Sequence, residues 1–168
     1  MAEYKLQDEV NFDFSGLRFA VVVSAYHQQI TGNLRAAAVQ TLTGHGVDPE
    51  RIDILQVPGA WELALGCQVV ARQQRYAGIV ALGAVIRGET THDQHINRFV
   101  SQALGELSLQ HNLPLGFGLL TCDDLAQAEA RSGGAVGNKG EEAAAAVLHM
   151  VALLDSPGSM DQTRERQP

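Results

Sequence analysis

The chain alternates short aliphatic runs with longer alanine-rich segments, and this alternation constrains its fold more than any other feature. The first run, Leu17 to Val23, is almost continuously apolar, as expected of a strand that is covered on both faces. From Thr31 onward, apolar residues recur at helical spacing until Gly44 and Gly46, where glycine can end a helix. A strand followed by such a helix predicts a fold of the α/β class.

The same alternation continues along the chain. Strands are expected at 51–57, 78–86 and 113–121, and helices at 61–74, 92–111, 141–154 and, in a short segment, up to Arg131. Asp123 and Asp124 are placed to cap the short helix. Because crossovers between parallel strands are right-handed, this order predicts a three-layer α/β/α sandwich around a four-stranded parallel sheet.

A single domain is expected over residues 1–155, with 1–16 as an N-terminal arm. Of the 168 residues, 45% are hydrophobic and 18% charged, which is typical of a chain with one sizeable core. Residues 156–168 lack apolar periodicity, so a disordered tail is expected there. Cys67 and Cys122 are isolated, and we interpret both as small core residues rather than as disulfide or metal ligands.

The charge of the chain excludes some classes of partner. A formal net charge of -7 repels phosphate backbones and argues against nonspecific nucleic-acid binding. The N-terminus has no basic segment followed by an apolar one, and no apolar run reaches the roughly 20 residues of a membrane span. A soluble cytoplasmic protein without membrane partners is expected.

Ligands of parallel sheets bind at the carboxyl ends of the strands, and two aromatic motifs fall there. Tyr26 and His27 follow the first strand and offer a stacking face and a hydrogen-bonding imidazole; the alternative is a half-buried loop tyrosine. Trp61, the only tryptophan, precedes Glu62 after a Pro-Gly turn, and it is either a ligand platform or a core residue.

A third motif, GETTH, follows the strand at 78–86. Free amides at the start of the next helix, with the hydroxyls of Thr90 and Thr91, could bind an anion such as phosphate. His92 is suited to proton transfer at neutral pH. The alternative is that a threonine merely caps the helix. His92 and His95 have the i, i+3 spacing of metal ligands, but without a clear third ligand no metal is predicted.

The glycine-rich segment from Arg131 to Gly140 carries two basic groups, Arg131 and Lys139. Arg offers a planar fork for phosphate and Lys a compact charge, so we expect a flexible loop that helps to bind an anion. The segment does not match a Walker loop, since Gly140 directly follows the lysine. The alternative is a plain connection between two helices with both charges solvated.

The motifs YHQQIT, VPGAWE, LGAVIRGETTH, FGLLT and RSGGAVGNKG, in this order, resemble lumazine synthase from about Leu17 to Leu154. The resemblance implies a flavodoxin-like sheet and a cofactor-independent transferase of riboflavin biosynthesis. That enzyme condenses 5-amino-6-(ribitylamino)uracil with 3,4-dihydroxy-2-butanone 4-phosphate. The product is 6,7-dimethyl-8-ribityllumazine.

The resemblance also implies a role for each matching residue. His92 corresponds to the catalytic histidine, and Glu89, Thr90 and Arg131 to the phosphate site. The pyrimidine and the ribityl chain are expected at Tyr26, His27, Ala60, Trp61, Glu62, Val85, Ile86, Phe117 and Lys139. Of these residues, Phe117, Arg131 and Lys139 would come from a neighbouring subunit, so the implied site lies between subunits of a homo-oligomer.

The chain departs from the family pattern after His92. The acidic residue that the family commonly carries two places later is Gln94 here, so Asp93 would have to orient the imidazole, or nothing would. The family resemblance implies pentamers, favours a shell of 60 subunits, and suggests riboflavin synthase as a partner. The alternatives are a weakly active flavin-binding or shell-forming relative, a flavodoxin-like electron carrier, and riboflavin synthase of the archaeal type.

Overall fold

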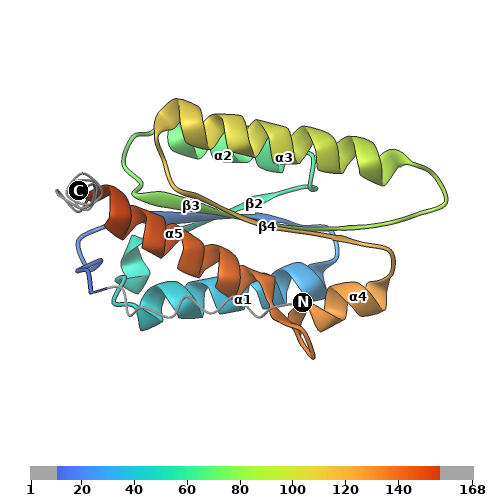
Figure 1. Cartoon of the computed structure of the whole chain (residues 1–168), viewed down its shortest axis with the longest axis horizontal. Coiled ribbons are helices and arrows are strands. Elements are labelled where there is room, and N and C mark those ends of the chain that lie inside the picture. The colour runs from blue at the N-terminus through green and yellow to red at the C-terminus, as the bar shows by residue number, and fades with distance from the viewer. Residues whose placement is uncertain (1–10, 156–168) are drawn as a thin grey trace, which may run out of the picture.

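A computed structural model describes residues 11–155 of the chain. It contains a four-stranded parallel sheet in the order β2-β1-β3-β4 (Figure 1). The strands are β1 (Phe19–Ser24), β2 (Ile52–Val57), β3 (Gly78–Ile86) and β4 (Leu115–Cys122). The helices are α1 (Gln28–Gly44), η1 (Pro49–Arg51), α2 (Leu63–Ala71), α3 (His92–His111), α4 (Leu125–Ala130) and α5 (Lys139–Asp155).

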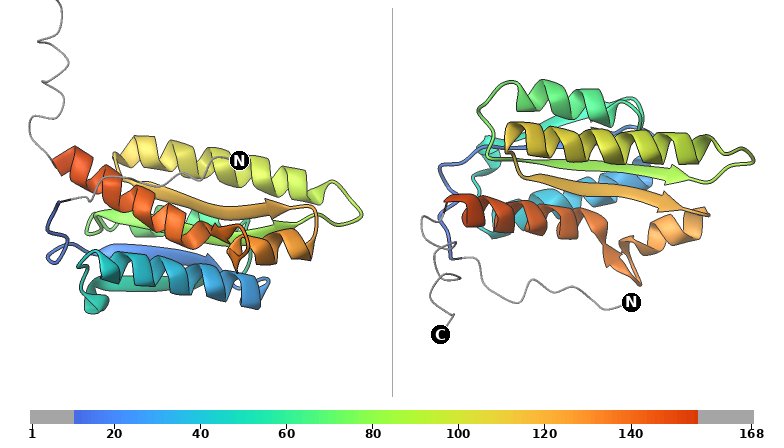
Figure 2. Two further views of the ribbon diagram at one scale, coloured as in Figure 1. Left: turned by 60° about the horizontal axis from the view of Figure 1, so that its bottom comes forward. Right: turned by 45° about the horizontal axis from the view of Figure 1, so that its top comes forward.

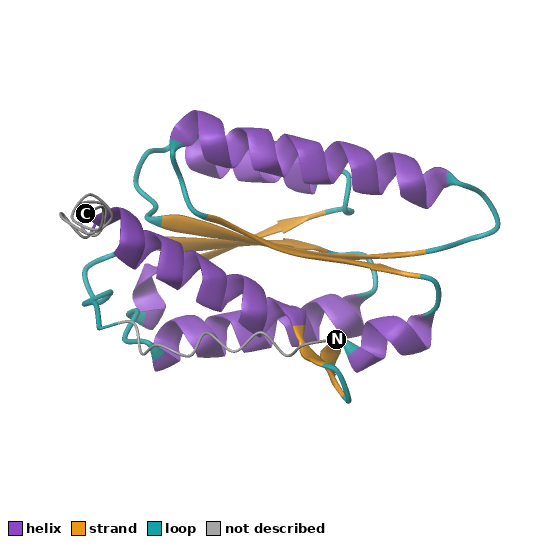
Figure 3. Ribbon diagram, viewed as in Figure 1, coloured by secondary structure: helices purple, strands orange, loops and turns teal. Residues whose placement is uncertain are grey.

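Helices cover both faces of the sheet. Figure 3 shows α2 and α3 on one face and α1, α4 and α5 on the other. Each face has its own buried hydrophobic cluster, one under α1 and α5 and one under α2 and α3. The predicted three-layer, flavodoxin-like α/β/α sandwich with a four-stranded parallel sheet is therefore confirmed.

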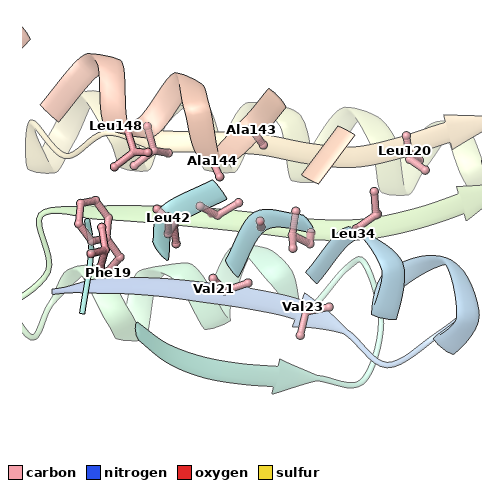
Figure 4. Close-up of a cluster of buried hydrophobic side chains, with 14 of the residues drawn as sticks. Phe19, Val21, Val23, Leu34, Leu42, Leu120, Ala143, Ala144 and Leu148 are labelled. Atoms are coloured by element: carbon pink, nitrogen blue, oxygen red, sulfur yellow. The ribbon is translucent and has the colours of Figure 1, made fainter. Parts of the chain in front are cut away.

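The central strand β1 explains the continuous apolar run that opened the analysis. Its side chains alternate between the two clusters, so that Phe19, Val21 and Val23 face α1 and α5 while Ala20 and Val22 face α2 and α3. Figure 4 shows Phe19, Val21 and Val23 close to side chains of α1 and α5. The labelled side chains of these helices include Leu34, Leu42, Ala144 and Leu148. Burial on both faces leaves no position in β1 for a charged residue.

The four strands do not end at the same level. Ser24 pairs with Val57, and the β1–β3 register places Val23 beside Leu82, whereas β3 and β4 remain paired up to Ile86 and Cys122. At about 3.3 Å per residue, β3 and β4 extend roughly 10 Å beyond β1. Figure 2 shows these two strands extending past β1 at their carboxyl ends.

Helix boundaries differ from the prediction at several ends. Helix α1 begins at Gln28 rather than Thr31, and α2 is shorter than expected because the turn before it includes Trp61 and Glu62. Asp124 caps α4, accepting a hydrogen bond from the Gln127 backbone N–H at 2.8 Å, whereas Asp123 does not cap it. The Asp123 carboxylate instead lies 3.7 Å from Arg87 Nη1.

The glycine-rich segment is not the flexible loop that the sequence predicted. It forms an antiparallel hairpin of β5 (Ser132–Gly134) and β6 (Gly137–Asn138). Gly133 and Gly137 take φ values of 111° and 94°, which residues other than glycine rarely adopt. The backbone N–H of Lys139 donates to the Arg131 carbonyl at 2.9 Å and closes the hairpin, so the two basic residues are held at its base.

Both cysteines are buried and free, as predicted for core residues. Burial raises the pKa of the Cys67 thiol to about 12, so this thiol is unreactive at neutral pH. None of the helices within residues 11–155 is both long and apolar enough to span a membrane. The predicted tail at 156–168 and the first ten residues of the predicted arm lie outside the described residues.

Gly116 of β4 sets the distance between the sheet and α5. An added Cβ there would overlap the backbone carbonyl of Ala143. We therefore expect Gly116→Ala to lower the free energy of unfolding by about 1–3 kcal/mol, measured by urea denaturation at fixed protein concentration.

The matched control for this change is Gly105→Ala in α3, where an added Cβ meets nothing within 4 Å. Alanine has the higher helix propensity, so this variant should gain up to about 1 kcal/mol. Equal losses in the two variants would contradict the packing argument.

Candidate active site

The carboxyl ends of the four parallel strands bring most of the predicted site residues to one edge of the sheet (Figure 1). The turn after β1 carries Tyr26 and His27, and the turn after β2 carries Ala60, Trp61 and Glu62. Strand β3 ends with Val85 and Ile86, and its following loop carries Glu89, Thr90 and His92.

The residues after β1 form an exposed aromatic pair. Tyr26 is 69% exposed, so the alternative of a half-buried loop tyrosine does not hold. His27 adopts the left-handed conformation, with φ 57° and ψ 54°, and its ring lies edge-on to that of Tyr26 with centroids 5.2 Å apart. The His27 carbonyl accepts the Thr31 backbone N–H at 3.0 Å and begins α1. A rigid turn therefore holds the tyrosine ring in solvent.

The turn after β2 places an aromatic ring beside a carboxylate. Trp61 stacks on Phe99 of α3, with centroids 4.0 Å apart and planes 23° from parallel. Its side chain is still 48% exposed, so it is neither a core residue nor an isolated platform. The Glu62 side chain folds back toward Gly59. A Cβ atom added to Gly59 would lie 3.0 Å from the Glu62 Oε2 atom. Glu62 forms no side-chain hydrogen bond or ion pair with any of residues 11–155, and its carboxylate is free to bind a ligand.

The loop after β3 leaves the start of α3 open. Thr91 occupies the N-cap position, but its hydroxyl makes no capping hydrogen bond, so the alternative of a purely capping threonine does not hold for this residue. Backbone amides at the start of a 20-residue helix carry partial positive charge and attract anions. Glu89, Thr90 and His92 are all exposed around these amides, which makes the loop suitable for a phosphate group.

His92 has no acidic partner within residues 11–155. No hydrogen bond joins it to Asp93, whose Oδ1 atom is buried and has no hydrogen-bond partner among the described residues. The Oδ1 atom of Asn97, one helical turn later, is buried and unpaired in the same way. The structure thus gives no support to the hypothesis that Asp93 orients the imidazole.

The two basic residues lie after β4, at the same edge of the sheet. Arg131 donates from Nη1 to the Gln127 carbonyl at 3.3 Å, and Lys139 Nζ contacts Glu142 Oε2 at 2.6 Å. Burial raises the pKa of the Cys122 thiol, and the charge of nearby Arg131 partly offsets that effect. Neither basic group is therefore fully solvated. The alternative of a plain connection between two helices required both charges to be solvated, so it does not hold.

Phe117 is the predicted residue that the chain does not bring to this edge. It pairs with Ala81 near the amino end of β4, five residues before Cys122. At about 3.3 Å per residue this is roughly 16 Å from the carboxyl end of the strand. Its side chain is 43% exposed. Phe117 therefore cannot act with Glu62 and His92 of the same chain.

Two hollows lie elsewhere in the structure, away from most of the predicted site residues. A hollow of about 430 Å³ lies at the amino ends of the strands, between Leu17, Tyr76 and His111. None of the predicted site residues lines it. A smaller one of about 240 Å³ lies between α1 and the end of β1, beside Gln28 and Arg35. Within residues 11–155, no group of three or more His, Cys, Asp or Glu side chains could hold a metal ion.

The family model described as 6,7-dimethyl-8-ribityllumazine synthase matches residues 16–155. The chain belongs to this family. A relative of that name from Desulfovibrio desulfuricans is 43% identical, covering 85% of this chain and 92% of the relative. One from Rhodopirellula baltica is 46% identical over 81% of this chain and 88% of its own. One from Xanthomonas euvesicatoria is 41% identical over 82% and 90%.

Three residues near this candidate site were not predicted from the sequence to contact it or one another. Phe99 contacts Trp61, and Arg87 pairs with Asp123 across the ends of β3 and β4. Phe99 is an apolar residue outside the buried stripe of α3, which was a signal that it contacts something other than the sheet. The Arg87–Asp123 pair left no such signal, because both residues lie in loops whose relative position depends on the strand register.

The left-handed backbone of His27 gives a prediction about stability. A residue with a Cβ is strained there by about 1 kcal/mol, and glycine is not. We expect His27→Gly to raise the free energy of unfolding by about 1 kcal/mol, measured by urea denaturation.

The control for His27→Gly is Asn112→Gly, at the left-handed C-cap of α3 and far from the site. Because asparagine tolerates this conformation, the control should change stability less. A loss of stability in His27→Gly would contradict the strain argument.

Proposed function

We propose that this protein is a 6,7-dimethyl-8-ribityllumazine synthase. It condenses 5-amino-6-(ribitylamino)uracil with 3,4-dihydroxy-2-butanone 4-phosphate and releases phosphate and water. The observation that carries the proposal is that Glu62 and the uncapped start of α3 with His92 both follow carboxyl ends of strands in one parallel sheet, in a chain of this family. That edge offers a carboxylate for hydroxyl groups and an anion site for phosphate.

One half of the site binds the pyrimidine. Tyr26 supplies an exposed ring for stacking, and His27 supplies a hydrogen-bonding group beside it. Lys139 of a neighbouring subunit adds a second hydrogen-bonding group. The unpaired carboxylate of Glu62 accepts hydrogen bonds from ribityl hydroxyls, which are donors that a free carboxylate binds well. The walls of this half come from Ala60, Trp61, Val85 and Ile86.

The other half binds the phosphate ester. The amides at the start of α3 and the hydroxyl of Thr90 hold the phosphate oxygens, next to Glu89. Arg131 of a neighbouring subunit adds a bidentate charge and stabilises the phosphate as it leaves. Holding both substrates at one edge supplies much of the rate enhancement through positioning.

The reaction consists of proton transfers, dehydrations and one elimination. The 5-amino group attacks the ketone, and loss of water gives an imine. Phosphate then leaves, and the resulting enol becomes a ketone that the ribitylamino nitrogen attacks. That attack closes the ring, and loss of a second water gives the product. No step changes the oxidation level of the pair of substrates, so the proposed reaction needs no redox cofactor, and His92 can move the protons.

Assembly completes the proposed site. Phe117 lies too far from its own Glu62, so we infer that a neighbouring subunit supplies Phe117 together with Arg131 and Lys139. The proposed assembly is a pentamer, and the short hairpin at 131–139 is compatible with a cytoplasmic shell of 60 subunits. Riboflavin synthase, which would consume the product, is the proposed partner.

A mixed assay tests the activity. Purified protein with both substrates should yield fluorescent ribityllumazine and phosphate in equal amounts. His92→Ala should lower kcat by about 10²-fold without abolishing it, since positioning and phosphate binding remain. His45→Ala at the far end of α1 should have no effect.

The outcomes separate the alternatives. Lumazine consumed rather than formed would indicate riboflavin synthase of the archaeal type. No product from assembled protein would favour a flavin-binding or shell-forming relative, and tightly bound flavin in the purified protein would favour an electron carrier. Complete loss of activity in an assembled His92→Ala protein would contradict the division between proton transfer and positioning.

Light scattering of the purified protein tests the assembly. The expected particle is the 60-subunit shell. Free pentamers alone would overturn the shell but preserve the shared site. A monomer with full activity would refute the shared site, because Phe117, Arg131 and Lys139 would then have no neighbour to serve.

A further inference from the structure

We propose that Phe99 is a positioning residue for the pyrimidine half of the site, acting through Trp61. The inference rests on the proposed function and adds a residue to it. Phe99 lies on α3, while Trp61 lies in the turn after β2, so their contact joins two segments that reach the site separately.

The contact has the geometry of a specific aromatic pair. The ring centroids are 4.0 Å apart and the planes are 23° from parallel, so one face of the indole is covered by the phenyl ring. Offset stacking of this kind is favourable beyond the area that it buries. The plane of the indole is thereby fixed relative to α3.

Phe99 is not needed to fill the core. It is 39% exposed, and neither ring of the pair belongs to the buried cluster beneath α2 and α3. That cluster takes its α3 residues from a different stripe, namely Val100, Leu104 and Leu107. Removal of the Phe99 ring would therefore leave the packing of α3 on the sheet intact.

The stack links the two halves of the site. Trp61 directly precedes Glu62, and Phe99 follows His92 by seven residues, or two helical turns of about 5.4 Å each. Fixing Trp61 against α3 fixes the turn that carries the Glu62 carboxylate at a set distance from the phosphate loop. Loss of the stack should loosen the ribityl contact and leave the phosphate contact unchanged.

The single tryptophan of the chain makes the stack directly observable, because tryptophan fluorescence, excited selectively over the three tyrosines, reports Trp61 alone. The variants are Phe99→Ala, Phe99→Leu, which keeps most of the volume without the aromatic ring, and Phe99→Tyr, which keeps the ring. Leu109→Ala is the matched control on the same helix, since Leu109 is 85% exposed.

We expect Phe99→Ala and Phe99→Leu to shift the Trp61 emission. Both should raise the KM for the ribitylaminopyrimidine, and its Kd measured calorimetrically with the pyrimidine alone, by about 2- to 10-fold. The kcat and the KM for the butanone phosphate should stay within about twofold. Phe99→Tyr should restore the wild-type values, and Leu109→Ala should match them.

Three results would overturn the inference. They are an emission shift with unchanged Kd for the pyrimidine, an equal rise in the KM of both substrates, and failure of Phe99→Tyr to restore binding. A wild-type protein that binds the pyrimidine but makes no lumazine would refute the proposed function alone, because the Kd comparison still decides the role of Phe99. A wild-type protein that does not bind the pyrimidine would refute both.

Discussion

The parallel pairing of β1 with β3 is the constraint on which the rest of the structure depends. Because both strands are covered on both faces, their registers are fixed by apolar side chains that have no alternative position. Parallel pairing then directs every strand end to the same edge of the sheet. The polar segments after β1, β2 and β3 converge there although they are far apart in the sequence.

The convergence is incomplete within one chain. Glu62 and His92 reach the carboxyl ends of the strands, but their side chains have no partners there among the described residues, and Phe117 remains near the amino end of β4. Arg131 and Lys139 are positioned by the hairpin after α4, whose base is closed by a single backbone hydrogen bond. This arrangement, with unpaired side chains at the strand ends and Phe117 far from them, is what the proposed site between subunits requires.

The sequence predicted the elements and their order because burial of β1 and the helical stripes follow from local periodicity. It also predicted that most of the candidate site residues would follow the carboxyl ends of the strands, where parallel sheets collect ligands. It did not predict the β5–β6 hairpin, which depends on two glycines with positive φ and on the hydrogen bond from the Lys139 backbone N–H to the Arg131 carbonyl. For the contact between Trp61 and Phe99, the position of Phe99 outside the buried stripe of α3 was a signal, but its partner was not predictable, because that depends on how the turn before α2 lies against α3.

The uncapped start of α3 suits both roles proposed for this segment, phosphate binding and proton transfer. A capping hydroxyl would stabilise the helix by about 1 kcal/mol, but it would occupy an amide that an anion needs. Helix α3 forgoes that bond at Thr91 and is held instead by its buried stripe at Val100, Leu104 and Leu107. The amides thus stay open for phosphate, and His92, on the same first turn, stays exposed beside them. The stability of the helix comes from its later turns, and its first turn is left for the proposed chemistry.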